Sequence, residues 1–458
     1  MPESNGFNRT TTIVIGVLEI LIYHLSFLLT FYIRYGWLRT YNYSAYQSAL
    51  PFIIIAFVLI NIFSGTYVFY NKRFIDVFSI TFISQILMSV SIMAMTFFGR
   101  WFAFPRTVVL LNLFVSTLLL FIWRVLILEF YFKKSGVGRV MVIGSVEKCQ
   151  EAIKNFKAAE TRQYKVVAAT FDNYFENIKE HMDQIDVFYL LDIKELDQEE
   201  EILSYLTLNN KQIFLGTDFG NILRINNNIM NIDDESLIAI SPFNISPDRD
   251  TIKRIMDVTL SFILIVLSSP IMFVAMLLIK LTSRGPIFYK QVRVTKGQQE
   301  FEIIKFRSMR IDAEKESGPV LAQSIDPRVT TVGKYLRMLR IDELPQLFNV
   351  LKGDMSLIGP RPERPYFVDQ FTEANPYYYL RHNVRAGITG YAQVYGKYST
   401  DFTSKLKFDL LYIKNYSLRL DIQILFQTIK TLFDKVSSEG IQDERTFDEV
   451  FDGIKIYE

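Results

Sequence analysis

The sequence predicts a membrane protein of three parts: a four-helix transmembrane region, a Rossmann-like α/β domain, and an α+β domain that enters the membrane through a re-entrant helix. Half of the 458 residues are hydrophobic and 15% are aromatic, which is more apolar than most soluble proteins. Long apolar stretches fill the N-terminal third, and two soluble segments follow. A fifth apolar stretch, interrupted by a proline, separates these two segments.

The composition excludes several kinds of site. The formal net charge is only +2, so the balance of the whole chain predicts no nucleic-acid partner. Cys149 is the single cysteine, which excludes an intramolecular disulfide and a zinc site built on cysteines. The three histidines lie far apart in the sequence, so we expect neither a multi-histidine metal site nor a Ser-His-Asp triad.

Four apolar stretches predict four transmembrane helices within residues 1–134. Each reaches about 20 residues, the length that a helix needs to cross the hydrocarbon core. They lie at 11–33, 50–70, 77–98 and 107–128. The first lacks the small-residue cleavage site of a signal peptide. A bias of Lys and Arg toward one set of helix ends favours both ends of this region on the cytoplasmic side.

Residues 135–248 have the alternating pattern of a small α/β domain. Three buried strands are predicted, at RVMVIGS (139–145), VFYLLD (187–192) and QIFLGT (212–217). Two helical segments, EKCQEAIKNF (147–156) and EEEILSYL (199–206), lie between them. Strands that alternate with helices predict a parallel, Rossmann-like sheet.

The first of these strands ends at Gly144, where a dinucleotide-binding turn would need a G-x-G-x-x-G run. Gly144 stands alone, and Gly136 and Gly138 precede the strand instead of following it. The sequence therefore favours a structural or regulatory role for this domain over the binding of a dinucleotide.

The fifth apolar stretch, residues 252–280, has two interpretations. It is long enough to cross the membrane, which would export everything that follows it. Pro270, preceded by Ser268 and Ser269, predicts instead a bend in the middle, because proline removes a helix hydrogen bond. The segment that follows is rich in Lys and Arg, which favour the cytoplasmic side. A re-entrant helix that returns to the same face fits both observations, although proline also occurs in crossing helices.

The stretch LRMLRIDELPQ (336–346) places two carboxylates, Asp342 and Glu343, side by side after two arginines. Pro345 suits the first position of a short helix. Apolar residues with helical spacing predict one buried face on this helix: Leu344, Leu347, Phe348 and Leu351. One interpretation is that the two acids cap the helix, whose N-terminal dipole favours negative charge.

The other interpretation is chemical. Arg361 follows in the proline-stiffened loop GPRPERP (359–365), and arginine is a common bidentate partner of phosphate. Carboxylates, a divalent cation and arginines are the groups that phosphoryl transfer uses. A carboxylate such as Asp342 can also serve as the nucleophile of such a reaction.

Three motifs resemble those of one family, the bacterial polyprenyl-phosphate sugar-1-phosphate transferases, or monotopic phosphoglycosyl transferases. They are KFRSMR (305–310), LRMLRIDELPQLFNVLKGDMSLIGPRPE (336–363) and VRAGITGYAQVYG (384–396). The similarity covers about residues 250–435 and includes the Ser-Pro pair of the fifth apolar stretch. The preceding spans and α/β domain resemble the large branch, the undecaprenyl-phosphate glucose or galactose phosphotransferases.

The resemblance implies a catalytic domain at residues 249–458 and a catalytic pair, Asp342 and Glu343. It implies that Asp342 attacks the β-phosphate of a UDP-sugar, releases UMP and holds the phosphosugar covalently. Undecaprenyl phosphate, deprotonated with help from Glu343, then takes the phosphosugar. The resemblance further implies Mg²⁺ at Asp342 and a hinge at Ser269 and Pro270. It also implies phosphate or substrate binding by three side chains: Lys305, Arg337 and Arg361.

The resemblance also implies a multi-pass protein of the bacterial inner membrane, in contact with membrane lipid, with its catalytic domain on the cytoplasmic face. A homodimer is plausible by similarity to large members of the family. The product would start the synthesis of exopolysaccharide, capsule or O-antigen.

The sequence departs from the family pattern at Ala386, Tyr391 and Tyr395, which replace proline, tryptophan and asparagine. These positions lie outside the acidic pair, so they put the identity of the sugar in doubt and not the reaction. One alternative is a membrane-bound nucleotide-sugar dehydratase or epimerase, but none of the 25 tyrosines has lysine four residues later. The other is a non-catalytic scaffold for polysaccharide assembly, in which the acids are only caps.

Overall fold

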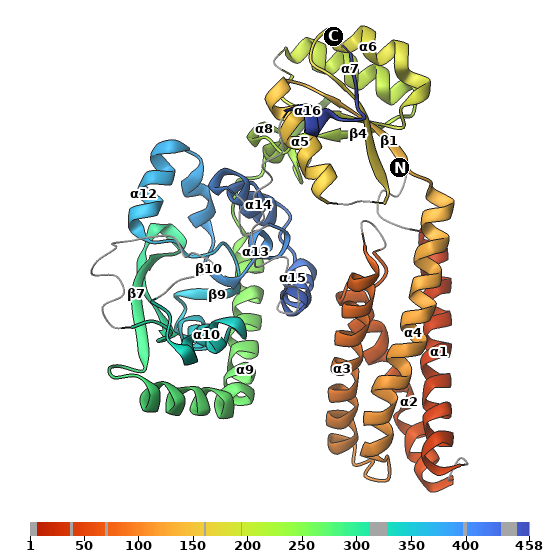
Figure 1. Cartoon of the computed structure of the whole chain (residues 1–458), viewed down its shortest axis with the longest axis vertical. Coiled ribbons are helices and arrows are strands. Elements are labelled where there is room, and N and C mark those ends of the chain that lie inside the picture. The colour runs from red at the N-terminus through yellow and green to blue at the C-terminus, as the bar shows by residue number, and fades with distance from the viewer. Residues whose placement is uncertain are drawn as a thin grey trace. The chain divides into compact units, whose positions relative to one another are not determined.

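The structure is a computed structural model of the whole chain (Figure 1). It describes residues 7–36, 40–68, 72–159, 162–193, 195–310, 328–396, 401–431 and 447–457. The chain divides into two compact units. The first contains residues 1–216 together with 443–458, and the second contains residues 217–442.

The first unit begins with four long apolar helices: α1 (Arg9–Tyr35), α2 (Thr40–Phe63), α3 (Phe74–Phe98) and α4 (Arg106–Ser135). All four are long and apolar enough to cross a membrane, as is α9 in the second unit. The membrane protein that the sequence predicts is therefore confirmed. Helix α2 begins earlier than the predicted stretch at 50–70, because the polar run TYNYSAYQSA is helical too and continues through Pro51.

A buried ion pair joins the four helices of the first unit. The guanidinium of Arg124 on α4 donates to both carboxylate oxygens of Glu19 on α1, at 2.8 Å each. It also donates to Asn61 Oδ1 of α2 at 2.7 Å and to Thr81 Oγ1 of α3 at 2.9 Å. The side chains of Arg124 and Glu19 are 2% and 1% exposed. Because one guanidinium reaches all three neighbouring helices, it fixes their mutual register.

We predict that Arg124→Met destabilises the helical bundle by about 3–5 kcal/mol, because it leaves the Glu19 carboxylate buried without its partner. The double variant Glu19→Leu/Arg124→Met should recover most of this loss, since it leaves no buried charge. Denaturant unfolding of the purified protein in detergent, followed by circular dichroism, measures both effects. A double variant as unstable as the single one would contradict the ion-pair explanation.

A five-stranded parallel sheet follows the helices, in the order β11-β2-β1-β3-β4. Its first four strands in sequence are β1 (Gly138–Ile143), β2 (Tyr164–Thr170), β3 (Val187–Leu190) and β4 (Gln212–Leu215). The helices between them are α5 (Val146–Ala158), α6 (Tyr174–His181) and α7 (Leu196–Leu208). The α/β domain that the sequence predicts is thus confirmed, although the sequence pattern missed β2.

The alternating residues of β1 separate the two cores of this domain. Val140 and Val142 face a core that contains residues of α5, whereas Met141 and Ile143 face a core that contains residues of α6 and α7. Because both faces of the strand are covered, its sequence is a continuous apolar run without polar alternation.

The C-terminal end of the chain completes this domain. Helix α16 (Phe447–Phe451) packs Val450 and Phe451 into the core on the α5 side of the sheet. Strand β11 (Lys455–Tyr457) pairs in parallel with β2. The chain therefore leaves the first unit after Gly216, forms the second unit, and then returns to the first.

The second unit contains small sheets and many helices around a large core and a smaller second one. It begins with α8 (Phe219–Arg224) and an antiparallel hairpin of β5 (Asn228–Ile232) and β6 (Glu235–Ala239). A second hairpin follows α9, formed by β7 (Phe288–Val294) and β8 (Glu300–Phe306), and β9 (Met355–Ile358) pairs with β10 (Ala386–Thr389). The remaining α-helices are α10 (Thr331–Met338), α11 (Gln346–Lys352), α12 (Pro365–Ala374), α13 (Tyr391–Tyr395), α14 (Phe402–Lys414) and α15 (Leu418–Thr431).

Helix α9 (Pro247–Thr282) contains Pro270 and changes direction sharply between its two halves (Figure 1). Pro270 has no N–H to donate to the carbonyl of Val266, four residues earlier. The hydroxyl of Ser269 donates to that carbonyl at 2.8 Å, and the hydroxyl of Ser268 donates to Leu264 O at 2.6 Å. The hydroxyl of Ser269 therefore satisfies the carbonyl that the proline leaves without its helical donor.

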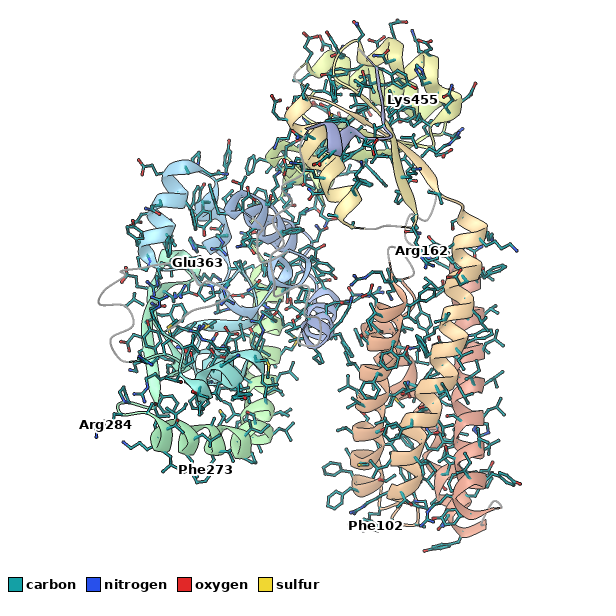
Figure 2. The ribbon with its side chains drawn as sticks, in the orientation of Figure 1. Phe102, Arg162, Phe273, Arg284, Glu363 and Lys455 are labelled. Carbon is teal, nitrogen blue, oxygen red and sulfur yellow. The ribbon has the colours of Figure 1, made fainter. Side chains whose placement is uncertain are left out.

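The first half of α9 is fixed by buried polar side chains on one face. Lys253 Nζ lies 2.6 Å from Asp421 Oδ2 of α15, and Asp257 Oδ1 accepts from the backbone N–H of Leu357 at 3.1 Å. The second half presents apolar side chains to the outside, and Phe273 is 65% exposed there (Figure 2). The first half of α9 is therefore held by buried polar contacts, whereas the second half has an exposed apolar surface.

Candidate active site

Three parts of the second unit meet at the carboxylate of Glu343. Strand β8 carries Lys305, the short 3₁₀ helix η3 (Ile341–Glu343) carries both acids, and the loop after β9 carries Arg361. Lys305 Nζ lies 3.3 Å from Glu343 Oε1, and Arg361 Nη2 lies 3.6 Å from the same oxygen. The structure therefore brings together four of the residues that the sequence analysis proposed for the site: Lys305, Asp342, Glu343 and Arg361.

The backbone before the acids is fixed by two local features. A Cβ on Gly333 of α10 would lie 2.0 Å from the carbonyl oxygen of Ser308, so only glycine permits this approach. One turn later, Arg337 Nε donates to Ser308 Oγ at 2.8 Å. After α10 ends, Arg340 adopts left-handed backbone angles of φ 51° and ψ 24°, which are uncommon for a residue with a side chain.

The turn at Arg340 redirects the chain into η3 and buries the acids. Asp342 is 9% exposed, and the side chain of Glu343 is 14% exposed. Arg340 also contributes a third cation, with its Nη1 3.9 Å from Glu343 Oε2. The sequence analysis did not place Arg340 in the site, although its position next to the acids in the sequence was an available signal.

The surroundings shift the pKa values of the two acids in opposite directions. Burial raises the pKa of Glu343, but the nearby charges of Lys305, Arg361 and Arg340 outweigh burial and lower the pKa to about 2. Burial raises the pKa of Asp342 to about 6, and the negative charge of Glu343 adds to this shift. Neighbouring acids with separated pKa values are a common arrangement in active sites.

Lys305 is the cation closest to the acids. Burial lowers its pKa, and the carboxylate of Glu343 partly offsets this effect. The position of Lys305 in β8 places it opposite Tyr289 of β7, in a regular antiparallel pair. A rigid hairpin therefore holds this ammonium group against Glu343.

The other proposed residues lie outside this cluster. Arg337 contacts Ser308, and its charge lowers the pKa of Asp342 slightly against the larger effect of burial. Ser269 and Pro270 lie inside α9, and the hinge role that the sequence analysis gives them stays a prediction. The helix predicted after Pro345 is α11, which buries Leu347 but leaves Phe348 45% exposed, so Phe348 was wrongly assigned to the buried face.

A divalent cation would have few protein ligands at this site. No group of three metal-ligating side chains occurs among the residues that the structure describes. Mg²⁺ commonly binds one or two carboxylates together with substrate phosphates and water. Because Glu343 faces three cations, Asp342 is the carboxylate available for such a shared site.

In the α/β domain, the turn between β1 and α5 is the place where a dinucleotide-binding domain would bind its ligand. This turn is occupied by a carboxylate of the chain itself. At the start of α5, Asp192 accepts hydrogen bonds from the backbone N–H of Ser145 at 3.1 Å and from its hydroxyl at 2.7 Å. A pyrophosphate would bind at this helix N-terminus in a dinucleotide-binding domain. The negative charge of Asp192 therefore disfavours such a ligand here.

The fold and the site define a membrane-associated protein that gathers two acids and several cations in its second unit. A family model for bacterial sugar transferases matches residues 248–435. These residues include both acids of the site and the three cations around Glu343. This chain belongs to the bacterial sugar transferase family.

Several curated proteins are similar to this chain. The UDP-N-acetylgalactosamine-undecaprenyl-phosphate N-acetylgalactosaminephosphotransferase of Aeromonas hydrophila is 54% identical over 41% of this chain and 45% of its own length. The UDP-glucose:undecaprenyl-phosphate glucose-1-phosphate transferase of Caulobacter vibrioides is 41% identical over 40% of this chain and 70% of its own length.

The uncharacterized sugar transferase EpsL of Bacillus subtilis is 38% identical over 42% of this chain and 90% of its own length. The match spans less than half the length of the Aeromonas relative. The similarity to these proteins therefore covers less than half of this chain and not the whole of it.

Proposed function

We propose that this chain transfers a sugar-1-phosphate from a UDP-sugar to undecaprenyl phosphate and releases UMP. The observation that carries this proposal is the carboxylate of Glu343 surrounded by Lys305, Arg340 and Arg361, with Asp342 beside it. The names of the Aeromonas and Caulobacter relatives give undecaprenyl-phosphate sugar phosphotransferases, which supports the same reaction here.

The reaction proceeds in two displacements in this proposal. A carboxylate oxygen of Asp342 attacks the β-phosphorus of the UDP-sugar, the bond to the bridging oxygen breaks, and UMP leaves. A phosphate oxygen of undecaprenyl phosphate then attacks the same phosphorus and displaces the carboxylate of Asp342. Asp342 is therefore regenerated at the end of each cycle.

Glu343 helps to deprotonate the lipid phosphate in the second step. With a pKa of about 2, its carboxylate is a weak base before substrate binds. The cations that hold the pKa down are also those that would bind substrate phosphates. When phosphates draw Lys305 and Arg361 away from it, the pKa of Glu343 rises and the carboxylate becomes a better base.

Mg²⁺ would be held by Asp342 together with substrate phosphates, and it would neutralise charge that develops on the leaving phosphate. Arg361 and Lys305 bind phosphate directly. Arg337, which is fixed by Ser308, adds positive charge near Asp342.

We predict that Asp342→Asn lowers UMP release to background, because the amide is not an anionic nucleophile. Glu343→Gln should slow the reaction strongly but preserve the covalent step. With UDP-sugar and Mg²⁺ but no lipid, intact-protein mass spectrometry should show a phosphosugar adduct on Asp342 that undecaprenyl phosphate discharges. Arg419→Gln, which changes an exposed side chain on α15, is the matched control and should leave turnover unchanged. Normal turnover of Asp342→Asn would overturn the assignment of the nucleophile.

We predict an acid limb in the rate of UMP release near pH 6, because Asp342 must be ionised to attack and its pKa is raised to about 6. Below that pH the rate should fall roughly tenfold per unit. Glu343→Gln removes the neighbouring negative charge, so it should move the limb to lower pH. Single-turnover rates at constant Mg²⁺ measure the pH profiles of the wild-type protein and of Glu343→Gln. If the acid limb does not move in Glu343→Gln, it belongs to the titration of a group other than Asp342.

We propose that α9 is re-entrant and does not cross the membrane, and that the four helices of the first unit cross it. The sharp bend at Pro270 and the apolar outer surface of the second half support this. The active site then lies on the cytoplasmic face of the bacterial inner membrane, where UDP-sugars are available.

We predict that cysteines at Asp248 and Lys290, placed in a Cys149→Ser background, react with a membrane-impermeant maleimide only after cells are opened. Asp248 lies in the first turn of α9 and Lys290 lies in β7 after its end, so a re-entrant helix leaves both on the cytoplasmic face. A cysteine at Trp101, between α3 and α4, is the matched control and should react in intact cells. Labelling of the Lys290→Cys variant, but not of the Asp248→Cys variant, in intact cells would show that α9 crosses.

The remaining proposals concern assembly and substrate. The α/β domain is Rossmann-like in this proposal but carries no dinucleotide, which the carboxylate of Asp192 at the first turn supports. A homodimer is supported by the β5–β6 hairpin, whose Ile229 and Ile238 are 77% and 71% exposed, because an isolated hairpin is marginally stable alone. N-acetylgalactosamine and glucose are the sugars to test first, and the product would start exopolysaccharide, capsule or O-antigen synthesis.

A further inference from the structure

Hydrogen bonds to four successive carbonyl groups hold the loop that carries Arg361. From Pro360 to Glu363, four successive carbonyl oxygens each accept a hydrogen bond from another part of the second unit. The outer two accept from backbone N–H groups: Gly387 donates to Pro360 O at 2.9 Å, and Val294 donates to Glu363 O at 3.0 Å. The inner two, on Arg361 and Pro362, accept from side chains.

Arg381 in the 3₁₀ helix η4 (Tyr378–Asn383) is the donor to Arg361. Its Nη2 donates to the carbonyl of Arg361 at 2.9 Å. The same guanidinium pairs with Asp409 Oδ2 at 2.8 and 2.9 Å and donates to the hydroxyl of Tyr378 at 2.8 Å. The side chain of Arg381 is 5% exposed, so its position is fixed by buried partners.

Arg293 of β7 is the donor to Pro362. Its Nη1 donates to the carbonyl of Pro362 at 3.0 Å and lies 3.5 Å from Glu363 Oε2. The other guanidinium nitrogens donate to Gln291 Oε1 at 2.7 and 3.1 Å, which fixes the plane of the group. Glu363 marks the end of this loop in Figure 2.

These contacts leave the side chain of Arg361 as the element of the loop that faces the site. Its side chain is 45% exposed and reaches Glu343 at 3.6 Å, whereas the arginines that hold its backbone are mostly buried. The prolines on either side restrict the backbone further. The direction of the Arg361 side chain therefore depends on the hydrogen bonds that Arg381 and Arg293 donate to the carbonyls of Arg361 and Pro362.

We propose that Arg293 and Arg381 are positioning residues, which hold the carbonyls of Pro362 and Arg361 so that the Arg361 guanidinium stands ready for a substrate phosphate. The inference rests on the proposed function, since it assigns how that phosphate site is built. Neither arginine needs to touch substrate for this role. A displacement of about 1 Å in a group that orients substrate can reduce a rate by up to about a hundredfold.

A double-mutant cycle between Arg293 and Arg361 tests the proposal. Arg293→Gln should lower kcat/KM for UMP release at least tenfold in the wild-type background, and have less than a twofold effect in the Arg361→Ala background. Arg293→Lys retains one donor for Pro362 O, so it should recover part of the rate. The Kd for UDP, measured by calorimetry on the same four proteins, gives a second cycle. This second cycle can be measured even if the activity of Arg361→Ala falls to background.

Lys414→Gln is the matched control. Lys414 Nζ also donates to a backbone carbonyl, that of Ser241 at 2.8 Å, but it holds the base of the β5–β6 hairpin and not the Arg361 loop. Any effect of this variant should be the same factor in both backgrounds. If Arg293→Gln likewise gives equal factors in both backgrounds, the positioning role is wrong. If the wild-type protein releases no UMP from any UDP-sugar, the proposed function fails instead, and the UDP cycle still decides the positioning role.

Discussion

The central constraint of the second unit is that one buried carboxylate, Glu343, faces three cations from three segments of the chain. Lys305 comes from a β-hairpin, Arg340 from a left-handed turn, and Arg361 from a proline-rich loop. Burial alone would favour the neutral acid, so the low pKa of Glu343 requires these cations to stay in place. The close packing that holds each segment is therefore a condition for the charge state of the site.

Helix α9 packs against the segment that carries the two acids. Met272, Ala275 and Ile279 of the second half of α9 form one hydrophobic core with Leu336 of α10, and Ile341 and Leu344 pack against it. The segment that contains the two acids therefore packs directly against α9, and the other face of α9 is apolar and exposed. A change in the direction of the second half of α9 would therefore move η3 as well, which links the geometry of the acids to that of the exposed apolar surface of this helix.

The sequence predicted the parts of the site that are close in sequence or belong to long motifs. Lys305, Asp342, Glu343 and Arg361 were proposed from such motifs, and the structure brings them together. Their catalytic roles and the domain limits at 134 and 248 stay predictions. Arg293 and Arg381 could not be recognised in this way, because their role depends on carbonyl groups 69 and 20 residues away in the chain. The same reason hid β11, whose partner β2 lies on the other side of the second unit in sequence.

The adjacency of Asp342 and Glu343 follows from these observations. Two neighbouring carboxylates repel, so in a symmetric environment the pair would lose its two protons in two steps, the second with a raised pKa that belongs to neither acid alone. Here all three cations that pair with a carboxylate of the dyad reach Glu343, so Glu343 stays ionised and its charge adds to burial in raising the pKa of Asp342. A carboxylate with a pKa near 6 is more basic than an ordinary aspartate and is still ionised at neutral pH. Burial, together with the neighbouring charge of Glu343, thus makes Asp342 the more basic carboxylate of the pair, which suits the role of nucleophile that we propose for it.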